Sequence, residues 1–175
     1  MQTRHQDRSA YFEETATSCR NYYLPYIEQH TSLKFGRKCR VMEVGCGIGG
    51  ILSIFAAMGA TVTGIDIHKP SIETAKTLFA ERGLKGTFIC SDIFDYSDTQ
   101  PYDLIILHDA LEHIPEKERL MLHLKSFLKA DGLLYLGFPA WQMPFGGHQQ
   151  MAKNRIIANC PYIHLLPRPL FRFVF

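Results

Sequence analysis

The chain has 175 residues, of which 46% are hydrophobic and 21% are charged, and its net charge is +2. This composition is typical of one globular domain with a sizeable core, and it excludes collagen-like and intrinsically disordered chains. Seven basic and four acidic residues lie in 1–40, eight and thirteen in 41–138, and four and none in 139–175. So small an asymmetry is typical of an ordinary solvated surface, and we expect no nucleic-acid partner.

The sequence has no signal for export or membrane insertion. The first 20 residues are polar and charged, and no apolar run is long enough to span a membrane. The five cysteines form no C-x-x-C pair. A reducing cytoplasm is therefore the expected location, without a membrane span.

The chain begins with helical signals over residues 8–34, which Pro25 breaks or re-aims. An apolar strand is expected at 40–44, and a burst of glycines follows at 45–50. The apolar residues after these glycines predict a helix that runs to about residue 58.

Strands and helices alternate through the rest of the central segment. The expected elements are strands at 61–66, 87–90, 102–107 and 133–138, and helices at 70–82 and 115–130. Alternation of this kind implies right-handed crossovers and a parallel sheet covered on both faces. We therefore predict an α/β protein, a Rossmann-like doubly wound sheet with strand order 3-2-1-4-5 and helices at the N-terminus.

The glycine turn suggests a site for a nucleotide-like ligand. Gly45, Gly47 and Gly50 fit the spacing G-x-G-x-x-G, and Asp66 follows Gly45 by 21 residues. On these features alone, an NAD(P)-dependent oxidoreductase is a fair interpretation. Glu43 argues against it, because the first strand of a dinucleotide-binding domain is usually apolar and a buried carboxylate is costly unless something pairs with it.

Four motifs resemble those of one enzyme family. The run E-V-G-C-G-I-G-G at 43–50 resembles motif I of class I S-adenosylmethionine (SAM)-dependent methyltransferases. T-G-I-D at 63–66 and S-D-I at 91–93 resemble the second and third motifs, and H-D-A-L-E-H-I at 108–114 looks like the loop after strand four in the ubiquinone-biosynthesis type. The resemblance covers Arg40 to Phe138 and implies a SAM cofactor and transfer of its methyl group.

This resemblance assigns cofactor-binding roles to the residues at the carboxyl ends of the strands. The expected set is Glu43, Gly45, Cys46, Gly47, Gly49, Asp66, Ile67, Asp92, Ile93 and His108. Asp66 would accept from the ribose hydroxyls, Asp92 would bind the adenine amino group, and Glu43 would balance the amino group of the methionine end. Three alternatives remain open: Asp66 caps the following turn, Asp92 is a turn acid, and Glu43 is purely structural.

An oxygen or nitrogen acceptor often needs a general base, and histidine suits that role near neutral pH. His148 is the preferred candidate because its glycine-flanked loop follows the fifth strand, and His113 and Asp109 are the others. The alternative is a purely structural role, in which His148 hydrogen-bonds a loop carbonyl. We expect no metal site, because Pro115 disfavours the regular helix that would gather ligands from 108–113.

The segment after residue 138 departs from the family pattern. Class I methyltransferases continue into strands six and seven, whereas 37 residues with five prolines follow here. We expect both strands to be missing, either because the sheet is shortened or because the chain is part of a longer protein. We favour the second explanation, since a bare fifth strand would leave a pairing edge exposed. We treat 1–175 as one SAM-binding domain, with 1–39 as a helical cap, 40–138 as the cofactor core and 139–175 as the substrate-side loop and tail.

Aromatic and aliphatic residues in this tail would suit an apolar or aromatic small-molecule acceptor. A homodimer through the sheet edge or the tail is a further expectation. Two other functions stay open beside methyl transfer: an NAD(P)-dependent oxidoreductase, and a SAM-binding module without turnover.

Overall fold

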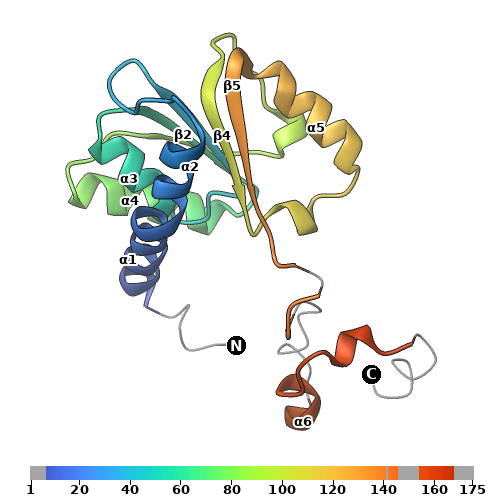
Figure 1. The fold of residues 1–175 in the computed structure, drawn as a ribbon. Coiled ribbons are helices and arrows are strands. Elements are labelled where there is room, and N and C mark those ends of the chain that lie inside the picture. Colours follow the sequence, from blue (N-terminus) through green and yellow to red (C-terminus); the bar gives the residue numbers. More distant parts are fainter. Residues whose placement is uncertain (1–6, 141, 146–153, 168–175) are drawn as a thin grey trace. The chain divides into compact units, whose positions relative to one another are not determined.

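The computed structural model describes residues 7–140, 142–145 and 154–167 (Figure 1). The backbone forms two compact units, residues 1–137 and 138–175, which are described separately below. No helix among the described residues is both long and apolar enough to cross a membrane.

The first unit is built on a five-stranded parallel sheet, as predicted. Its strands are β1 (Arg40–Val44), β2 (Thr61–Asp66), β3 (Thr87–Cys90), β4 (Tyr102–His108) and β5 (Leu128–Gly137). They lie in the order β3-β2-β1-β4-β5, and each neighbouring pair is parallel. Because the chain runs outward in both directions from β1, the connections diverge between β1 and β4, where doubly wound proteins bind their ligands.

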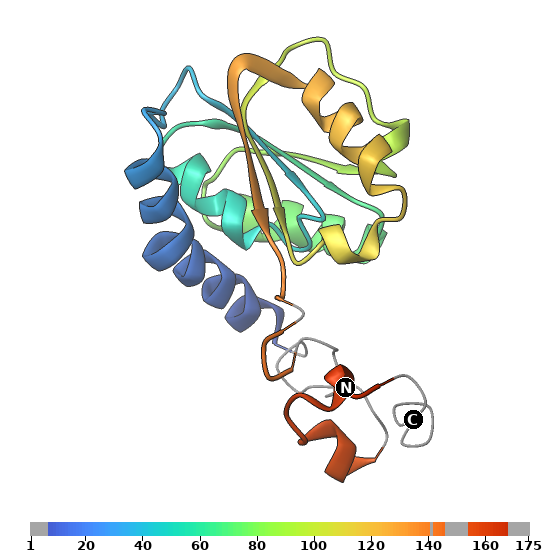
Figure 2. The same cartoon turned by 45° about the vertical axis from the view of Figure 1, so that its right-hand side comes forward.

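Helices cover both faces of this sheet (Figure 2). The longer helical elements are α1 (Arg8–Ser18), the π turn η2 (Cys19–Tyr23), α2 (Leu24–His30), α3 (Gly50–Ala57), α4 (Lys69–Glu81) and α5 (Lys117–Ser126). Two single 3₁₀ turns, η3 (Ile93–Asp95) and η4 (Leu111–His113), follow β3 and β4. The predicted helix over 8–34 is thus divided by a π turn, just before Pro25.

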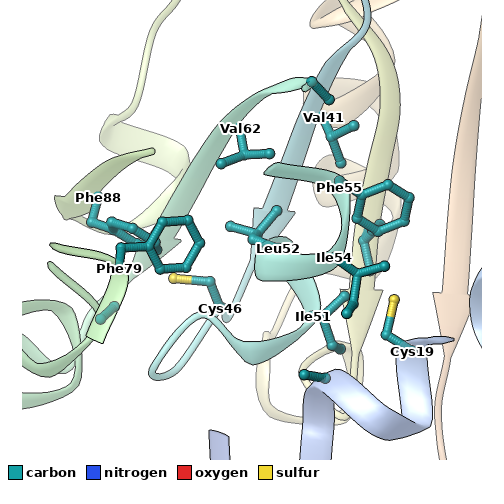
Figure 3. Packing of buried hydrophobic residues seen from close by; sticks show 14 of the residues in the cluster. Cys19, Val41, Cys46, Ile51, Leu52, Ile54, Phe55, Val62, Phe79 and Phe88 are labelled. Atoms are coloured by element: carbon teal, nitrogen blue, oxygen red, sulfur yellow. The ribbon is translucent and has the colours of Figure 1, made fainter. Parts of the chain in front are cut away.

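The core has two layers because side chains alternate across the strands. Val41, Val62, Leu104 and Ile106 face α1, α3 and α4, and Figure 3 shows this layer packed around Leu52 and Phe55. Met42, Val44, Ile65, Ile105 and Leu107 face Leu120, Leu124 and Phe127 on the other side. Glu43 shares the orientation of Val41, so its carboxyl enters the α3 layer.

The expected helix over 115–130 is too long, and the corresponding strand begins earlier than predicted. Helix α5 ends at Ser126, and β5 starts at Leu128, which pairs with Tyr102. The Tyr102 amide donates to the Phe127 carbonyl at 2.7 Å, which draws this segment into the sheet. Tyr102 pairs with Leu128 and Leu104 with Leu133, so β5 accommodates three extra residues at this register shift. Gly132 lies within it, and a Cβ there would lie 2.9 Å from the Tyr102 carbonyl oxygen.

The second unit contains two short helical segments, α6 (Arg155–Ala158) and η6 (Ile163–Leu165). Within 138–140, 142–145 and 154–167 no residue forms a strand, so the described part of the chain has no counterpart of strands six and seven.

Candidate functional site

The turn after β1 adopts the conformation for which glycine is suited. Gly45, Gly47 and Gly49 have φ angles of 74°, 51° and 85°. The Gly45 amide donates to the Ile65 carbonyl at 2.8 Å, and a Cβ at Gly45 would lie 2.6 Å from the Ala110 Cβ. The turn therefore packs against both neighbouring strand ends, and a larger residue at 45 would be excluded by conformation and by space.

Two pockets adjoin this turn. The larger has a volume of about 690 Å³ and is lined mainly by the residues after β2, β3 and β4; the smaller has about 260 Å³ and lies between the glycine turn and the N-terminal helices. Gly45 and Asp109 line both pockets. The arrangement suits an elongated ligand with two chemically different ends joined beside Gly45.

Glu43 is a buried carboxyl at the smaller pocket, with 3% of its surface exposed. Its Oε2 has no hydrogen-bond partner among the described residues, whereas the Leu52 backbone hydrogen-bonds the carboxyl. Burial first, and then the nearby charge of Asp66, raise the pKa of Glu43 well above its ordinary value. An unpartnered carboxyl oxygen at a pocket fits a cationic ligand group, such as the ammonium of an amino acid.

Two aspartates line the larger pocket. Asp66 is the last residue of β2, and Asp92 lies two residues after the end of β3. Asp66 accepts from the backbone amides of Gly47 and His68, each at 2.8 Å, so it links the glycine turn to the start of α4. Asp92 accepts from the Phe94 amide at 2.9 Å and begins η3. The capping roles left open for both residues therefore occur, and each carboxylate retains further acceptor positions for a ligand.

His108 and Asp109 lie at the end of β4. His108 Nδ1 is 3.3 Å from Asp109 Oδ2, and its ring packs against Tyr23 with centroids 4.4 Å apart. A Cβ at Gly137 would lie 2.5 Å from His108 Cδ2, so the glycine leaves space for the imidazole. Asp109 has a φ of 51°, unusual for a residue with a side chain, and sits where the two pockets meet.

Of the other two candidate bases, the structure describes His113 but not His148. His113 lines the larger pocket, and its Nε2 is 4.0 Å from Glu112 Oε1. His148 lies outside the described residues. Residues 111–113 form a single 3₁₀ turn, and no group of three metal-ligating side chains occurs within the described part of the chain.

Of the remaining expected cofactor residues, Cys46 lines the smaller pocket, two line the larger pocket and Gly49 lines neither. Cys46 is buried beside Glu43 and lines the smaller pocket, and burial raises the pKa of its thiol well above the ordinary value. Ile67 and Ile93 line the larger pocket. Gly49 lines neither; a Cβ there would lie 3.0 Å from the Phe88 ring, so this glycine packs against the core.

Sequence reasoning did not identify several residues that line the pockets. The N-terminal helices contribute five to the smaller pocket: Tyr11, Glu14, Thr15, Ser18 and Tyr23. The larger pocket also includes Phe94, Ile114, Pro115, Glu116 and Arg119, with the Arg119 guanidinium 4.3 Å from the Phe94 ring centroid. The helical spacing of Tyr11, Glu14, Thr15 and Ser18 is a sequence signal for four of the first group, whereas Tyr23 does not follow that spacing.

Comparison with known proteins gives a consistent result. Residues 36–168 match the family described as "Methyltransferase domain". A protein named ubiquinone biosynthesis O-methyltransferase from Actinobacillus pleuropneumoniae is 39% identical over 119 residues, which cover 64% of this chain and 50% of that protein. Its namesake from Coxiella burnetii is 38% identical over 114 residues, covering 64% and 47%. The chain thus spans about half the length of these curated relatives.

Solved structures share the fold. An S-adenosylmethionine-dependent methyltransferase from Clostridium acetobutylicum matches with a TM-score of 0.59 and 18% identity, over 71% of this chain and 49% of that one. A plantazolicin methyltransferase in complex with a substrate analogue and SAH matches with a TM-score of 0.61 and 19% identity, over 90% and 63%.

Proposed function

This chain belongs to the methyltransferase domain family, and on that premise we propose that it binds SAM and transfers the methyl group to a small-molecule acceptor. The observation that carries the proposal is Glu43, whose buried and unpartnered Oε2 adjoins a glycine turn between two pockets. An ammonium group is the natural partner of such an oxygen, and SAM carries one on its amino-acid end. A nicotinamide cofactor has no corresponding group at that position.

The two pockets suit the two ends of SAM. In this proposal the adenosine occupies the larger pocket, where Asp66 accepts from the ribose hydroxyls and Asp92 from the adenine amino group. Ile67 and Ile93 supply apolar contacts to the sugar and the ring. The amino-acid end occupies the smaller pocket beside Glu43, Cys46, Gly47 and His108, and Gly45 allows close approach at the junction.

Bound SAM would supply an electrophilic methyl group on a sulfonium. The protein has to align the acceptor with the S–CH₃ bond and to remove the acceptor's proton where an oxygen or nitrogen is methylated. Asp109 lies where the pockets meet and His113 lines the larger one, so both are proposed proton acceptors. His148, which lies outside the described residues, is a third candidate on the basis of the sequence.

The names of the curated relatives favour an oxygen acceptor. The aromatic and aliphatic residues of the tail are the reason for proposing an apolar or aromatic small molecule. Residues 139–175 are proposed to form the substrate side of the site. We also propose a cytoplasmic location, because the five cysteines form no C-x-x-C pair. We further propose a homodimer through the sheet edge, because β5 pairs only with β4 in the described part of the chain.

Calorimetric titration tests the proposal directly. SAM and S-adenosylhomocysteine (SAH) should bind to the full chain, whereas NAD(H) should not. Tighter binding of NAD(H) would overturn the proposal.

A SAM-binding module without turnover is the second candidate, since the site described above accounts for cofactor binding and names no acceptor. Turnover should be measured over a panel of phenol, carboxylate and amine acceptors. SAM binding without turnover on any of them would favour the second candidate.

A further inference from the structure

The N-terminal helix α1 presents one polar stripe to the smaller pocket. Tyr11, Glu14, Thr15 and Ser18 all line it, at intervals of three and four residues. This spacing places side chains on one face of an α-helix. If the α-helix continued unchanged, the next members of the stripe would be Asn21 and Tyr22.

The structure does not continue the stripe in that way. Asn21 and Tyr22 are exposed, Tyr22 with 69% of its surface, and the pocket is lined instead by Tyr23, five residues after Ser18. The π turn η2 causes the shift, with the Leu24 amide donating to the Cys19 carbonyl five residues earlier. Pro25 has no N–H to continue an α-helical pattern at the next position, which favours the wider turn. Single π turns of this kind often occur at functional sites.

The π turn brings two hydroxyl groups together at the pocket. The Ser18 side chain lies close enough to the Tyr23 phenol to influence its pKa. Burial raises the pKa of Tyr23 to about 12, so the phenol keeps its proton near neutral pH and can donate it. The Tyr23 ring is also held against His108, with centroids 4.4 Å apart.

The charges around the smaller pocket indicate that these hydroxyls could serve as hydrogen-bond donors to an anionic ligand group. Its described lining residues include three carboxyl groups, on Glu14, Glu43 and Asp109, and no lysine or arginine. An anionic ligand group therefore has to be bound by donors other than lysine and arginine. The Thr15 hydroxyl already donates to the Tyr11 and Phe12 carbonyls. Beside the His108 ring, this leaves the hydroxyls of Ser18 and Tyr23 and the first amides of α3, at Gly50 and Ile51, which lack intrahelical acceptors.

We propose that the π turn sets Ser18 and Tyr23 side by side as the subsite for the carboxylate of the SAM amino-acid end. The inference rests on the proposed function, since it assumes that this end occupies the smaller pocket. It deepens that function by assigning the ammonium to Glu43 and the carboxylate to the opposite, helical wall.

Binding of two ligands to matched variants tests the subsite. SAH carries the amino-acid end, and 5′-methylthioadenosine has the same nucleoside without it. The variants are Tyr23→Phe, which keeps the ring against His108 but removes the hydroxyl, and Ser18→Ala. Tyr22→Phe is the control, because it removes the same atom from the exposed neighbour in the same turn.

Tyr23→Phe should weaken SAH binding by about tenfold or more, as expected for losing a hydrogen bond to a charged group. Its affinity for 5′-methylthioadenosine should stay within about twofold of the unchanged chain, since the nucleoside does not reach this wall. Ser18→Ala should show the same selectivity, and Tyr22→Phe should change neither affinity.

Equal weakening of both ligands in Tyr23→Phe would overturn the subsite, and so would unchanged SAH binding in both variants. If the unchanged chain binds neither ligand, the proposed function itself fails. Binding of both ligands by the unchanged chain with no selective loss in the variants removes only the subsite.

Discussion

The substitution Glu43→Gln should raise the free energy of unfolding of the ligand-free protein and reduce the further stabilisation that a bound ligand provides. Glu43 is almost fully buried, and its Oε2 has no partner among the described residues. Burial raises its pKa, so keeping the carboxyl in the folded protein at neutral pH carries a cost that the unfolded chain avoids. Gln has nearly the same shape, has no charge and keeps an oxygen for the hydrogen bond with the Leu52 backbone.

The size of the effect follows from proton linkage. A Glu carboxyl ordinarily titrates near pH 4.5, whereas the folded-state pKa of Glu43 lies well above that value. Between the two pKa values the folded protein holds one proton more than the unfolded chain, so its stability falls as the pH rises. The slope is about 1.4 kcal/mol per pH unit for one proton. Below the unfolded pKa the contribution vanishes.

Urea unfolding at a series of pH values measures this slope. Subtracting the free energy of unfolding of the unchanged chain from that of Glu43→Gln cancels the other titrating groups. The difference should be constant at low pH and grow by up to about 1.4 kcal/mol per unit above pH 4.5. Replacement of the exposed Glu28 by Gln controls for the change in net charge. A difference independent of pH would refute the reasoning.

The ligand should stabilise the unchanged chain more than it stabilises Glu43→Gln. Saturating SAH stabilises the folded state according to its affinity, and its ammonium should favour the ionised form of Glu43. The thermal shift produced by SAH should therefore be larger for the unchanged chain than for Glu43→Gln. An equal shift would mean that Glu43 does not pair with the ligand.

Three further predictions concern the surroundings of the site. Gly64→Ala would place a Cβ 2.7 Å from Cys46 Sγ, and urea unfolding should show a loss of about 1–3 kcal/mol; an unchanged midpoint would contradict this packing. Asp66→Ala removes the acceptor of two backbone amides as well as the proposed ribose ligand, so calorimetry should show much weaker SAH binding with the fold retained by circular dichroism. Asp98→Ala removes a carboxylate shared by the hydroxyls of Tyr96 and Tyr102, so the free energy of unfolding should fall by about 1–3 kcal/mol while SAH affinity stays the same.

Local sequence signals correctly predicted most of the first unit. Alternation of apolar strands and amphipathic helices gave the sheet order, and the glycines at 45, 47 and 49 adopt the positive φ angles for which glycine is suited. The boundary between α5 and β5 was wrong because Leu128 and its neighbours suit either element. Pairing with Tyr102 decides between them, and that contact comes from a distant segment of the chain.

The sequence by itself determined the positive φ angles of the glycine turn and placed the acids Glu43, Asp66 and Asp92 in or just after parallel strands. It could do so because residue type and local spacing encode backbone conformation and chemistry. Only the tertiary structure decided which side chains share a pocket. Tyr23 lies on the pocket wall because a π turn shifts the helical stripe by one residue. Glu43 is buried because α3 packs over β1, and the Leu52 backbone of that helix hydrogen-bonds the carboxyl but leaves its Oε2 without a partner among the described residues. Such relations depend on how elements far apart in the sequence pack together, and no local pattern contains that information.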